Sequence, residues 1–199
     1  MKIFCIGFPK SATKTLTRAF SSTGMAAFHQ NTTDGQNVAT ALVSGNRDKD
    51  NPFYYLNQRF QSFAITEADY TNFDRGIVEW PQLDYLLLRN ALFHNPNSIM
   101  ILNYRNPESL LDSFTRWKDG DFRDRVTRAD LPGLPTGVGD KEQDMLDWFE
   151  RHFMACRAMF RIYRTRFIEV DIESPDFQSK LEHFLDIRFN WWGVENANP

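Results

Sequence analysis

The sequence contains few cysteines, and their positions suggest neither a structural bridge nor a metal site. Cys5 and Cys156 are the only two in the chain, and they lie far apart in the sequence. Two isolated thiols give neither a disulfide framework nor the closely spaced ligands of a zinc site. We expect both to be buried, reduced packing residues, which is typical of a cytoplasmic protein.

Long apolar runs and a strong basic charge are also missing. No apolar segment approaches the roughly 20 residues of a membrane span, and residues 2–7 lack the length and cleavage site of a signal peptide. The net charge is −3, so no overall basic field favours nucleic acid. The sequence therefore predicts a cytoplasmic protein with no membrane span and no nucleic-acid partner.

What is present is an alternation of strand and helix patterns along 199 residues, which fits a single domain over residues 1–199. We expect strands over 2–7, 76–80, 98–104 and 167–170, and helices over 12–23, 36–45, 52–64, 82–94, 107–117, 140–165 and 175–186. Such alternation favours an α/β fold of three layers, α/β/α, with a central and mainly parallel sheet, as in P-loop NTPases.

The most informative segment lies between the first expected strand and the first expected helix. A turn at this place presents backbone N–H groups and the positive end of a helix dipole, which together favour a bound anion. Lys10 adds a positive charge there. The residues that we expect to bind phosphate groups are Pro9, Lys10, Ser11, Ala12, Thr13, Lys14 and Thr15.

The register of this turn differs from that of a Walker A loop. Such a loop needs Gly-x4-Gly-Lys-Ser/Thr, and counting from Gly7 puts Ala12, Thr13 and Lys14 at the last three positions. The order Pro-Lys-Ser-Ala-Thr instead resembles the 5′-phosphosulfate loop of the sulfotransferase family, commonly Pro-Lys-Ser/Thr-Gly-Thr-Thr. Ala12 departs from that pattern where the family usually has glycine, and Lys14 departs where threonine is commoner.

A second motif follows the apolar run over residues 98–104. Arg105 ends this expected strand at the edge where open α/β sheets bind ligands, and its guanidinium suits a phosphate group. Ser113 lies on the helix that follows. The order Arg105-Asn106-Pro107 with a later serine resembles the 3′-phosphate motif of the same family, which implies that Arg105 and Ser113 hold a 3′-phosphate.

The resemblance implies a sulfotransferase, an enzyme that moves a sulfuryl group from 3′-phosphoadenosine 5′-phosphosulfate (PAPS) to an acceptor hydroxyl or amine and releases 3′-phosphoadenosine 5′-phosphate (PAP). Lys10 would neutralise charge on the departing phosphate, and the scheme requires no metal. Family members place a His or Glu base at the end of a strand before the 3′-phosphate motif, which implies Glu79 as the catalytic base. Asp69, Asp74 and His29 are the alternatives.

Residues 118–139 combine many charges with proline and glycine, which predicts a solvated surface loop or a lid over the site. Arg123 and Arg128 are the residues to test for a role in such a lid. Aromatic residues that could line an acceptor or adenine site are Trp117, Phe122, Trp191 and Trp192.

Two other functions stay open: a P-loop kinase acting on a small molecule, and a non-catalytic nucleotide-binding module. The kinase predicts a Walker A register and a metal-binding Asp at the end of a later strand, whereas the strand over residues 98–104 ends in Arg105. The acceptor of a sulfotransferase also stays open, among small metabolites, carbohydrates, lipids and peptide hydroxyls.

Overall fold

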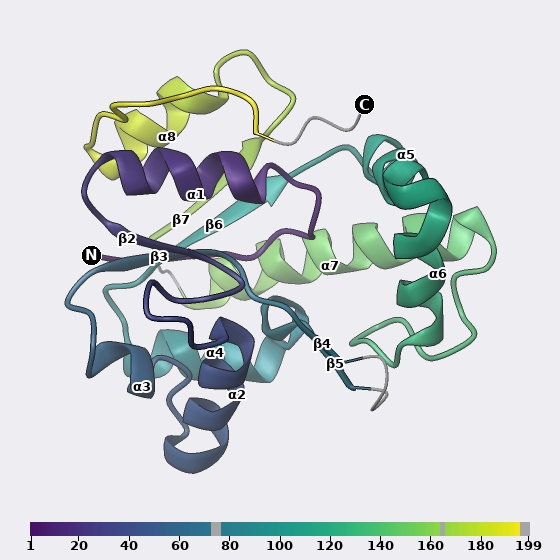
Figure 1. Ribbon diagram of the computed structural model, residues 1–199, viewed down its shortest axis with the longest axis horizontal. Helices are drawn as coiled ribbons and strands as arrows, with labels where there is room; N and C mark the ends of the chain where they lie inside the picture. The colour runs from purple at the N-terminus through teal and green to yellow at the C-terminus, as the bar shows by residue number, and fades with distance from the viewer. Residues whose placement is uncertain (73–76, 164–165, 196–199) are drawn as a thin grey trace.

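The chain folds into one parallel sheet between two layers of helices (Figure 1). The computed structural model describes the backbone of residues 1–72, 77–163 and 166–195, and their side chains except those of 70–72, 77–79 and 118–119. The strands are β1 (Lys2–Cys5), β2 (Ala26–His29), β3 (Phe63–Glu67), β4 (Tyr70–Asn72), β5 (Ile77–Glu79), β6 (Ile99–Tyr104) and β7 (Arg166–Asp171). The helices are α1 (Thr13–Ser22), α2 (Val38–Lys49), α3 (Tyr54–Asn57), α4 (Tyr85–His94), α5 (Pro107–Arg116), α6 (Asp121–Arg128), α7 (Glu142–Tyr163) and α8 (Phe177–Leu185), with short 3₁₀ turns η2 (Pro81–Leu83) and η3 (Trp117–Gly120).

The central sheet has the strand order β2-β3-β1-β6-β7, and every neighbouring pair is parallel. In the middle of this sheet, Ile3 of β1 is aligned with Ala64 of β3 on one side and with Ile99 of β6 on the other. Because all five strands point the same way, their carboxyl ends meet at one edge, where open α/β sheets bind ligands. β4 and β5 form a separate antiparallel ribbon.

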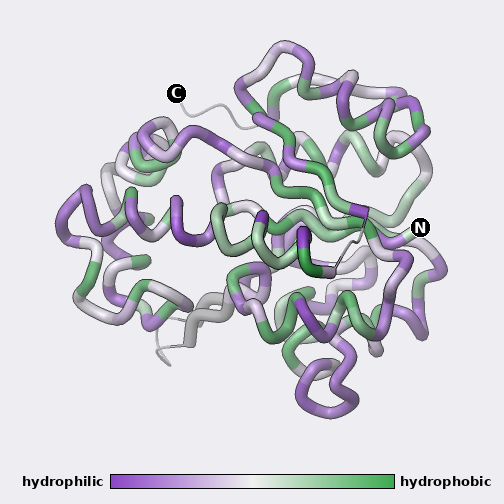
Figure 2. Tube along the Cα trace, turned by 180° about the vertical axis from the view of Figure 1, so that it is seen from behind, coloured by the Kyte–Doolittle hydropathy of each residue, from purple (hydrophilic) through white to green (hydrophobic). Residues whose placement is uncertain are grey.

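Apolar side chains on both faces of the strands hold the helical layers against the sheet. Ile3 and Cys5 pack with residues of α1 and α8 on one face, whereas Phe4 and Ile6 pack with residues of α2, α4 and α7 on the other. Figure 2 shows the hydrophobic strands running through the middle of the molecule. The structure confirms the predicted three-layer α/β/α fold of P-loop-like type, and both cysteines are buried and unpaired.

Three sequence predictions differ from the structure. The helix predicted over 52–64 is wrong beyond α3, because Phe63–Glu67 forms β3, a strand with every residue buried. The strand predicted over 76–80 exists as β5, but it pairs with β4 outside the central sheet. Residues 118–139, predicted as a loop, include the end of η3 and all of α6.

Candidate functional site

The turn between β1 and α1 has a backbone conformation suited to an anion. Lys10 and Ala12 have positive φ angles of 70° and 60°, whereas Ser11 between them does not. Alternation of left-handed and right-handed residues turns successive N–H groups toward one concave side. Ala12 immediately precedes the first residue of α1, so the helix dipole adds to the attraction for a negative ligand.

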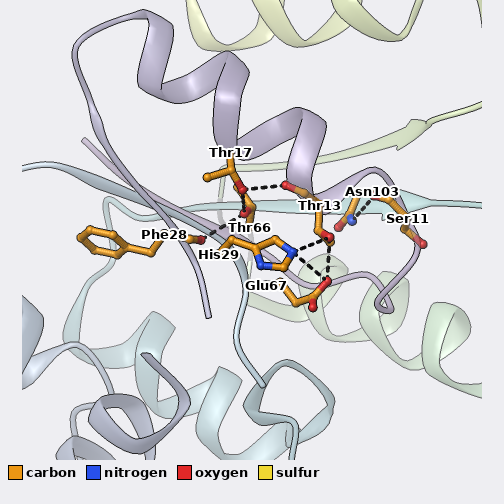
Figure 3. Close-up of polar contacts among 8 residues, drawn as sticks. All are labelled: Ser11, Thr13, Thr17, Phe28, His29, Thr66, Glu67 and Asn103. Carbon is orange, nitrogen blue, oxygen red and sulfur yellow. Dashed lines mark hydrogen bonds and ion pairs between the residues drawn. The ribbon is translucent and has the colours of Figure 1, made fainter. Parts of the chain in front are cut away.

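The side chain of Asn103 in β6 forms hydrogen bonds with both ends of this turn. Its Oδ1 accepts a hydrogen bond from the Gly7 amide at 2.9 Å. Its Nδ2 donates to the Ser11 carbonyl at 2.8 Å, as Figure 3 shows. A Cβ on Gly7 would lie 2.4 Å from the Asn103 carbonyl oxygen, so only glycine fits at that position. Asn103 is fully buried, and it binds a carbonyl oxygen that would otherwise repel an anion.

The two motifs found in the sequence meet at Arg105. Its Nη1 donates to the Lys10 carbonyl at 3.0 Å, and its Nε forms an ion pair with Glu173 Oε1 at 3.1 Å. Ser113 is buried on α5, the helix that follows Arg105. Arg105 and the turn at Lys10 therefore lie on the same edge of the sheet and in direct contact.

The ammonium group of Lys10 lies against aromatic rings from η3 and α6. Its Nζ is 4.6 Å from the centre of the Trp117 ring and 5.9 Å from that of Phe122, distances at which a cation is attracted to a ring face. The Phe122 ring stacks on the Trp80 ring, with 6.0 Å between the ring centres. The predicted candidates Trp117 and Phe122 thus border the turn.

The remaining residues predicted to bind phosphate differ in their exposure. Pro9 is buried, and Lys14 is exposed. Ser11 is fully buried, and its Oγ has no hydrogen-bond partner. Thr15 Oγ1 accepts a hydrogen bond from the Glu195 amide at 3.1 Å, which ties the C-terminal segment to the start of α1.

A carboxylate and an imidazole from two neighbouring strands converge on Thr13 (Figure 3). Glu67 ends β3, and its Oε2 accepts a hydrogen bond from Thr13 Oγ1 at 2.6 Å. His29 ends β2, and its Nε2 lies 3.3 Å from Thr13 Oγ1 and 3.6 Å from Glu67 Oε2. The three groups stand at the carboxyl edge of the sheet, beside the first turn of α1.

Burial changes the acid–base properties of this group. It raises the pKa of Glu67, although the hydrogen bond from Thr13 and the charge of Lys10 act in the opposite direction. Burial, together with the charge of Glu67, raises the pKa of Asp69 to about 6. Burial also lowers the pKa of His29 to about 4, so this imidazole is neutral at pH 7.

The predicted base lies on the ribbon rather than in the central sheet. Glu79 is the last residue of β5, opposite Tyr70 of β4, and its side chain lies outside the described residues, as does all of Asp74. Asp69 directly precedes β4, and its Oδ1 is buried without a partner. Glu79 therefore stays a prediction, while the structure adds Glu67 as a carboxylate in contact with the turn.

The other predicted candidates, apart from Arg128, make contacts within their own part of the fold. Arg123 donates to the Asp140 carbonyl at 2.9 Å and pairs with Glu142, and Arg128 is exposed at the end of α6. The guanidinium carbon of Arg18 lies 4.1 Å from the centre of the Trp191 ring. Trp192 packs against Phe177 and Phe189. The two C-terminal tryptophans therefore belong to the packing of the layer formed by α1 and α8.

Sequence reasoning missed two functional candidates, Glu67 and Asn103. Each carried a signal: Glu67 follows the apolar run 63–65, and Asn103 interrupts the apolar run 99–102. A polar residue within or at the end of a buried strand needs a partner. Here the partner of Asn103 is Gly7 in the turn between β1 and α1, and the partner of Glu67 is Thr13, the first residue of α1.

Neither a protein-family model nor a curated protein matches this sequence. In the described part of the chain, no group of three or more His, Cys, Asp or Glu side chains is arranged to hold a metal ion. The described helices include none with the length and hydropathy of a membrane span. Function therefore has to be inferred from the chemistry of the chain's own residues.

Proposed function

We propose that this protein is a sulfotransferase that moves a sulfuryl group from PAPS to an acceptor hydroxyl or amine. The observation that carries the proposal is the 3.0 Å hydrogen bond from Arg105 Nη1 to the Lys10 carbonyl. It joins an anion-binding turn to a guanidinium at the same sheet edge, and a donor with phosphate groups at both its 5′ and 3′ ends needs two such groups close together.

The residues present fit an anionic nucleotide. The positive φ angles of Lys10 and Ala12, on either side of Ser11, are typical of turns that gather N–H groups on one side, and the buried Ser11 hydroxyl has no partner of its own. Arg105 and the buried Ser113 would hold the 3′-phosphate, as the family resemblance implies. PAPS, when bound, supplies an activated sulfuryl group with PAP as its leaving group.

The chain's own part in the reaction is to orient the reactants and to compensate charge. Lys10 moves from the Trp117 ring to neutralise the negative charge that builds up on the departing phosphate, which is the main electrostatic need of such a transfer. Its long flexible stem allows that movement. The N–H groups of the turn hold the 5′ side of the donor in line with the acceptor.

The acceptor oxygen or nitrogen must lose a proton as it attacks, and a carboxylate can take it. We assign this role to Glu67. Its Oε2 lies 2.6 Å from Thr13 Oγ1, next to the turn. Burial raises its pKa, which makes it a better proton acceptor than an exposed glutamate. Glu79 stays the alternative base from the family resemblance. The two candidates are separated by their glutamine variants.

A transfer assay with radiolabelled PAPS and a mixed set of acceptors tests the proposal. We expect transfer by the wild-type chain and a loss of at least about 100-fold in Lys10→Ala, because a key positive charge at the leaving group is gone. Lys49→Ala, which removes an exposed lysine at the end of α2, is the matched control and should keep activity. PAP binding without any transfer would instead support the non-catalytic module.

One observation favours a kinase as the second candidate. Glu67 ends the strand next to β1 and touches a threonine hydroxyl of the turn, and a carboxylate and hydroxyl pair of this kind holds Mg²⁺ in P-loop enzymes. A kinase would bind ATP with Mg²⁺ more tightly than PAP and would transfer phosphate. The same protein sample, assayed with both donors, distinguishes the two functions.

A further inference from the structure

Residues 190–195 follow α1 from its carboxyl end to its amino end (Figure 1). At the carboxyl end, Asn190 Nδ2 donates a hydrogen bond to the Ser22 carbonyl at 2.6 Å. At the amino end, the Glu195 amide donates to Thr15 Oγ1 at 3.1 Å. Thr15 is the third residue of α1, so this C-terminal segment reaches the first helical turn after the anion-binding turn.

Arg18 holds the segment in this position. Its guanidinium carbon lies 4.1 Å from the centre of the Trp191 ring, a distance at which a cation is attracted to a ring face, and its Nη1 forms an ion pair with Glu195. Arg18 follows Thr15 by three positions, which places both side chains on one face of α1. The contacts of Arg18 therefore keep the Glu195 backbone beside Thr15.

The hydroxyl group of Thr15 has a proton available for a ligand. A threonine hydroxyl accepts hydrogen bonds and donates one, and in the described part of the chain that of Thr15 accepts from the Glu195 amide and donates to no residue. Thr17, by contrast, donates its proton to the Thr13 carbonyl at 2.8 Å, the usual partner of a threonine inside a helix. Thr15 is only 6% exposed, and a polar group buried to this extent usually has a partner.

Other donor groups at the start of α1 are also available to a ligand. The first α-helical hydrogen bond joins the Leu16 amide to the Ala12 carbonyl at 2.9 Å, which leaves the preceding N–H groups of residues 13–15 without an intrahelical partner. Ser11 Oγ, just before the helix, is fully buried and has no partner among the described residues. A phosphate group brings several acceptor oxygens to such donors, and the helix dipole favours its negative charge.

The Glu195 amide restricts the direction of the Thr15 proton. A free hydroxyl group rotates about its C–O bond, whereas one that accepts an N–H group keeps a lone pair toward that donor and points its proton elsewhere. The amide also polarises the hydroxyl group, because hydrogen bonds in a chain strengthen one another. The Thr15 hydroxyl is thereby a better directed and stronger donor than that of an isolated threonine.

We propose that residues 190–195 form part of the donor site, in which the Glu195 amide positions the Thr15 hydroxyl and this hydroxyl donates a hydrogen bond to the 5′-phosphate group of the nucleotide. Glu195 is a positioning residue that acts through its backbone N–H, while its carboxylate serves to pair with Arg18. This inference rests on the proposed sulfotransferase function and adds a segment distant in the sequence to its donor site.

The experiment measures the affinities of the full chain for PAP and for adenosine 5′-monophosphate by calorimetry. Thr15→Val removes the hydroxyl group but keeps the shape of the side chain, and we expect both affinities to fall at least about 10-fold, because a hydrogen bond to a charged group is lost. Thr15→Ser keeps the hydroxyl group and should bind as the wild type does. Glu195→Pro removes the N–H group and should weaken the binding of both nucleotides about three- to tenfold, whereas Glu195→Gln keeps it and is the matched control.

A double variant separates positioning from packing. Because Glu195 acts through the Thr15 hydroxyl, Glu195→Pro should cause no further loss of affinity in the Thr15→Val chain. The preference for PAP over the monophosphate should stay unchanged in every variant, since both nucleotides carry the 5′-phosphate. Additive losses, a reduced preference for PAP, an equal loss in Glu195→Gln, or wild-type affinity in Thr15→Val or Glu195→Pro overturns this inference alone. A wild-type chain that binds no PAP overturns the proposed function and this inference with it.

Discussion

Asn103 Oδ1 accepts the Gly7 amide proton at 2.9 Å, across 96 positions of sequence. The same side chain donates to the Ser11 carbonyl at 2.8 Å, and Arg105 two residues later binds the Lys10 carbonyl. Two carbonyl oxygens of the turn are thus turned toward β6, which leaves N–H groups for the opposite side. β6 therefore shapes the anion site that β1 and α1 form.

Asn103→Asp tests this role as a positioning residue. The carboxylate keeps the acceptor for Gly7 but opposes the Ser11 carbonyl, so we expect a loss of about 1–3 kcal/mol in stability and a PAP affinity at least 10-fold weaker, measured by calorimetry below the melting temperature. Asn95→Asp is the control, because Asn95 is also buried and donates to Asn51 and Ala91 far from the turn. Wild-type PAP affinity in Asn103→Asp would contradict the assignment.

Ala12 occupies a conformation that favours glycine. Its φ of 60° costs an L-residue roughly 1–2 kcal/mol, while glycine adds about 0.4–1 kcal/mol of entropy to the unfolded chain. We expect Ala12→Gly to raise the free energy of unfolding by up to about 1 kcal/mol, as measured by urea denaturation. Ala158→Gly, at an exposed position inside α7, is the control and should lower the free energy of unfolding by about 1 kcal/mol. An equal loss of stability in the two variants would contradict the claim that the backbone of Ala12 is strained.

Glu67 and Glu79 make different predictions as the base. If Glu67 takes the proton, Glu67→Gln lowers kcat about 10²–10⁴-fold, whereas Glu79→Gln leaves kcat near the wild-type value. The base must be deprotonated to act, and burial raises the pKa of Glu67. The rate should therefore fall, as the pH is lowered, at a higher pH than an exposed glutamate would give. The reverse order of the two variants would return the role to Glu79.

Glu173 competes with a phosphate for the Arg105 guanidinium. Their ion pair, at 3.1 Å, is partly exposed, and such pairs are worth up to about 1 kcal/mol. Glu173→Gln should therefore bind PAP up to about fivefold more tightly. Asp176→Asn in the same loop, which pairs with Lys180 instead, should leave PAP affinity unchanged. Weaker PAP binding in Glu173→Gln would mean that Glu173 supports the site rather than competing for it.

The sequence predicted the parts of the site that combine a local motif with a clear strand pattern. The turn at Lys10 and the run ending in Arg105 stand next to strands β1 and β6, whose apolar residues are unambiguous. β3 was missed because its few apolar residues fit a helix or a strand equally well, and length alone does not decide. Because β3 was not predicted, Glu67 was not placed at the end of a sheet strand. The role of catalytic base was therefore predicted for Glu79, at the end of the ribbon strand β5.

Pairings between distant segments also could not be read from local patterns. The contact between Asn103 and Gly7 depends on β6 lying beside β1, and the pairing of Tyr70 with Glu79 depends on the ribbon. Neither order is encoded in the spacing of apolar residues, because the strand order of a parallel sheet does not follow the order of the chain. The contact between Thr15 and Glu195 becomes visible only once the packing of residues 190–195 on α1 is known.

The central claim is that the turn at Lys10 binds the 5′ side of the donor while Arg105 binds its 3′-phosphate. The most direct test measures the affinities for PAP and for adenosine 5′-monophosphate, which lacks only the 3′-phosphate. Both affinities are measured in the wild type and in Arg105→Ala. We predict that the wild type prefers PAP at least tenfold and that Arg105→Ala loses this preference while its affinity for the monophosphate stays within a factor of two or three, because a hydrogen-bonded charge pair is worth about 1.5–3 kcal/mol. Equal affinity of the wild type for both nucleotides, or an undiminished preference in Arg105→Ala, would contradict the account.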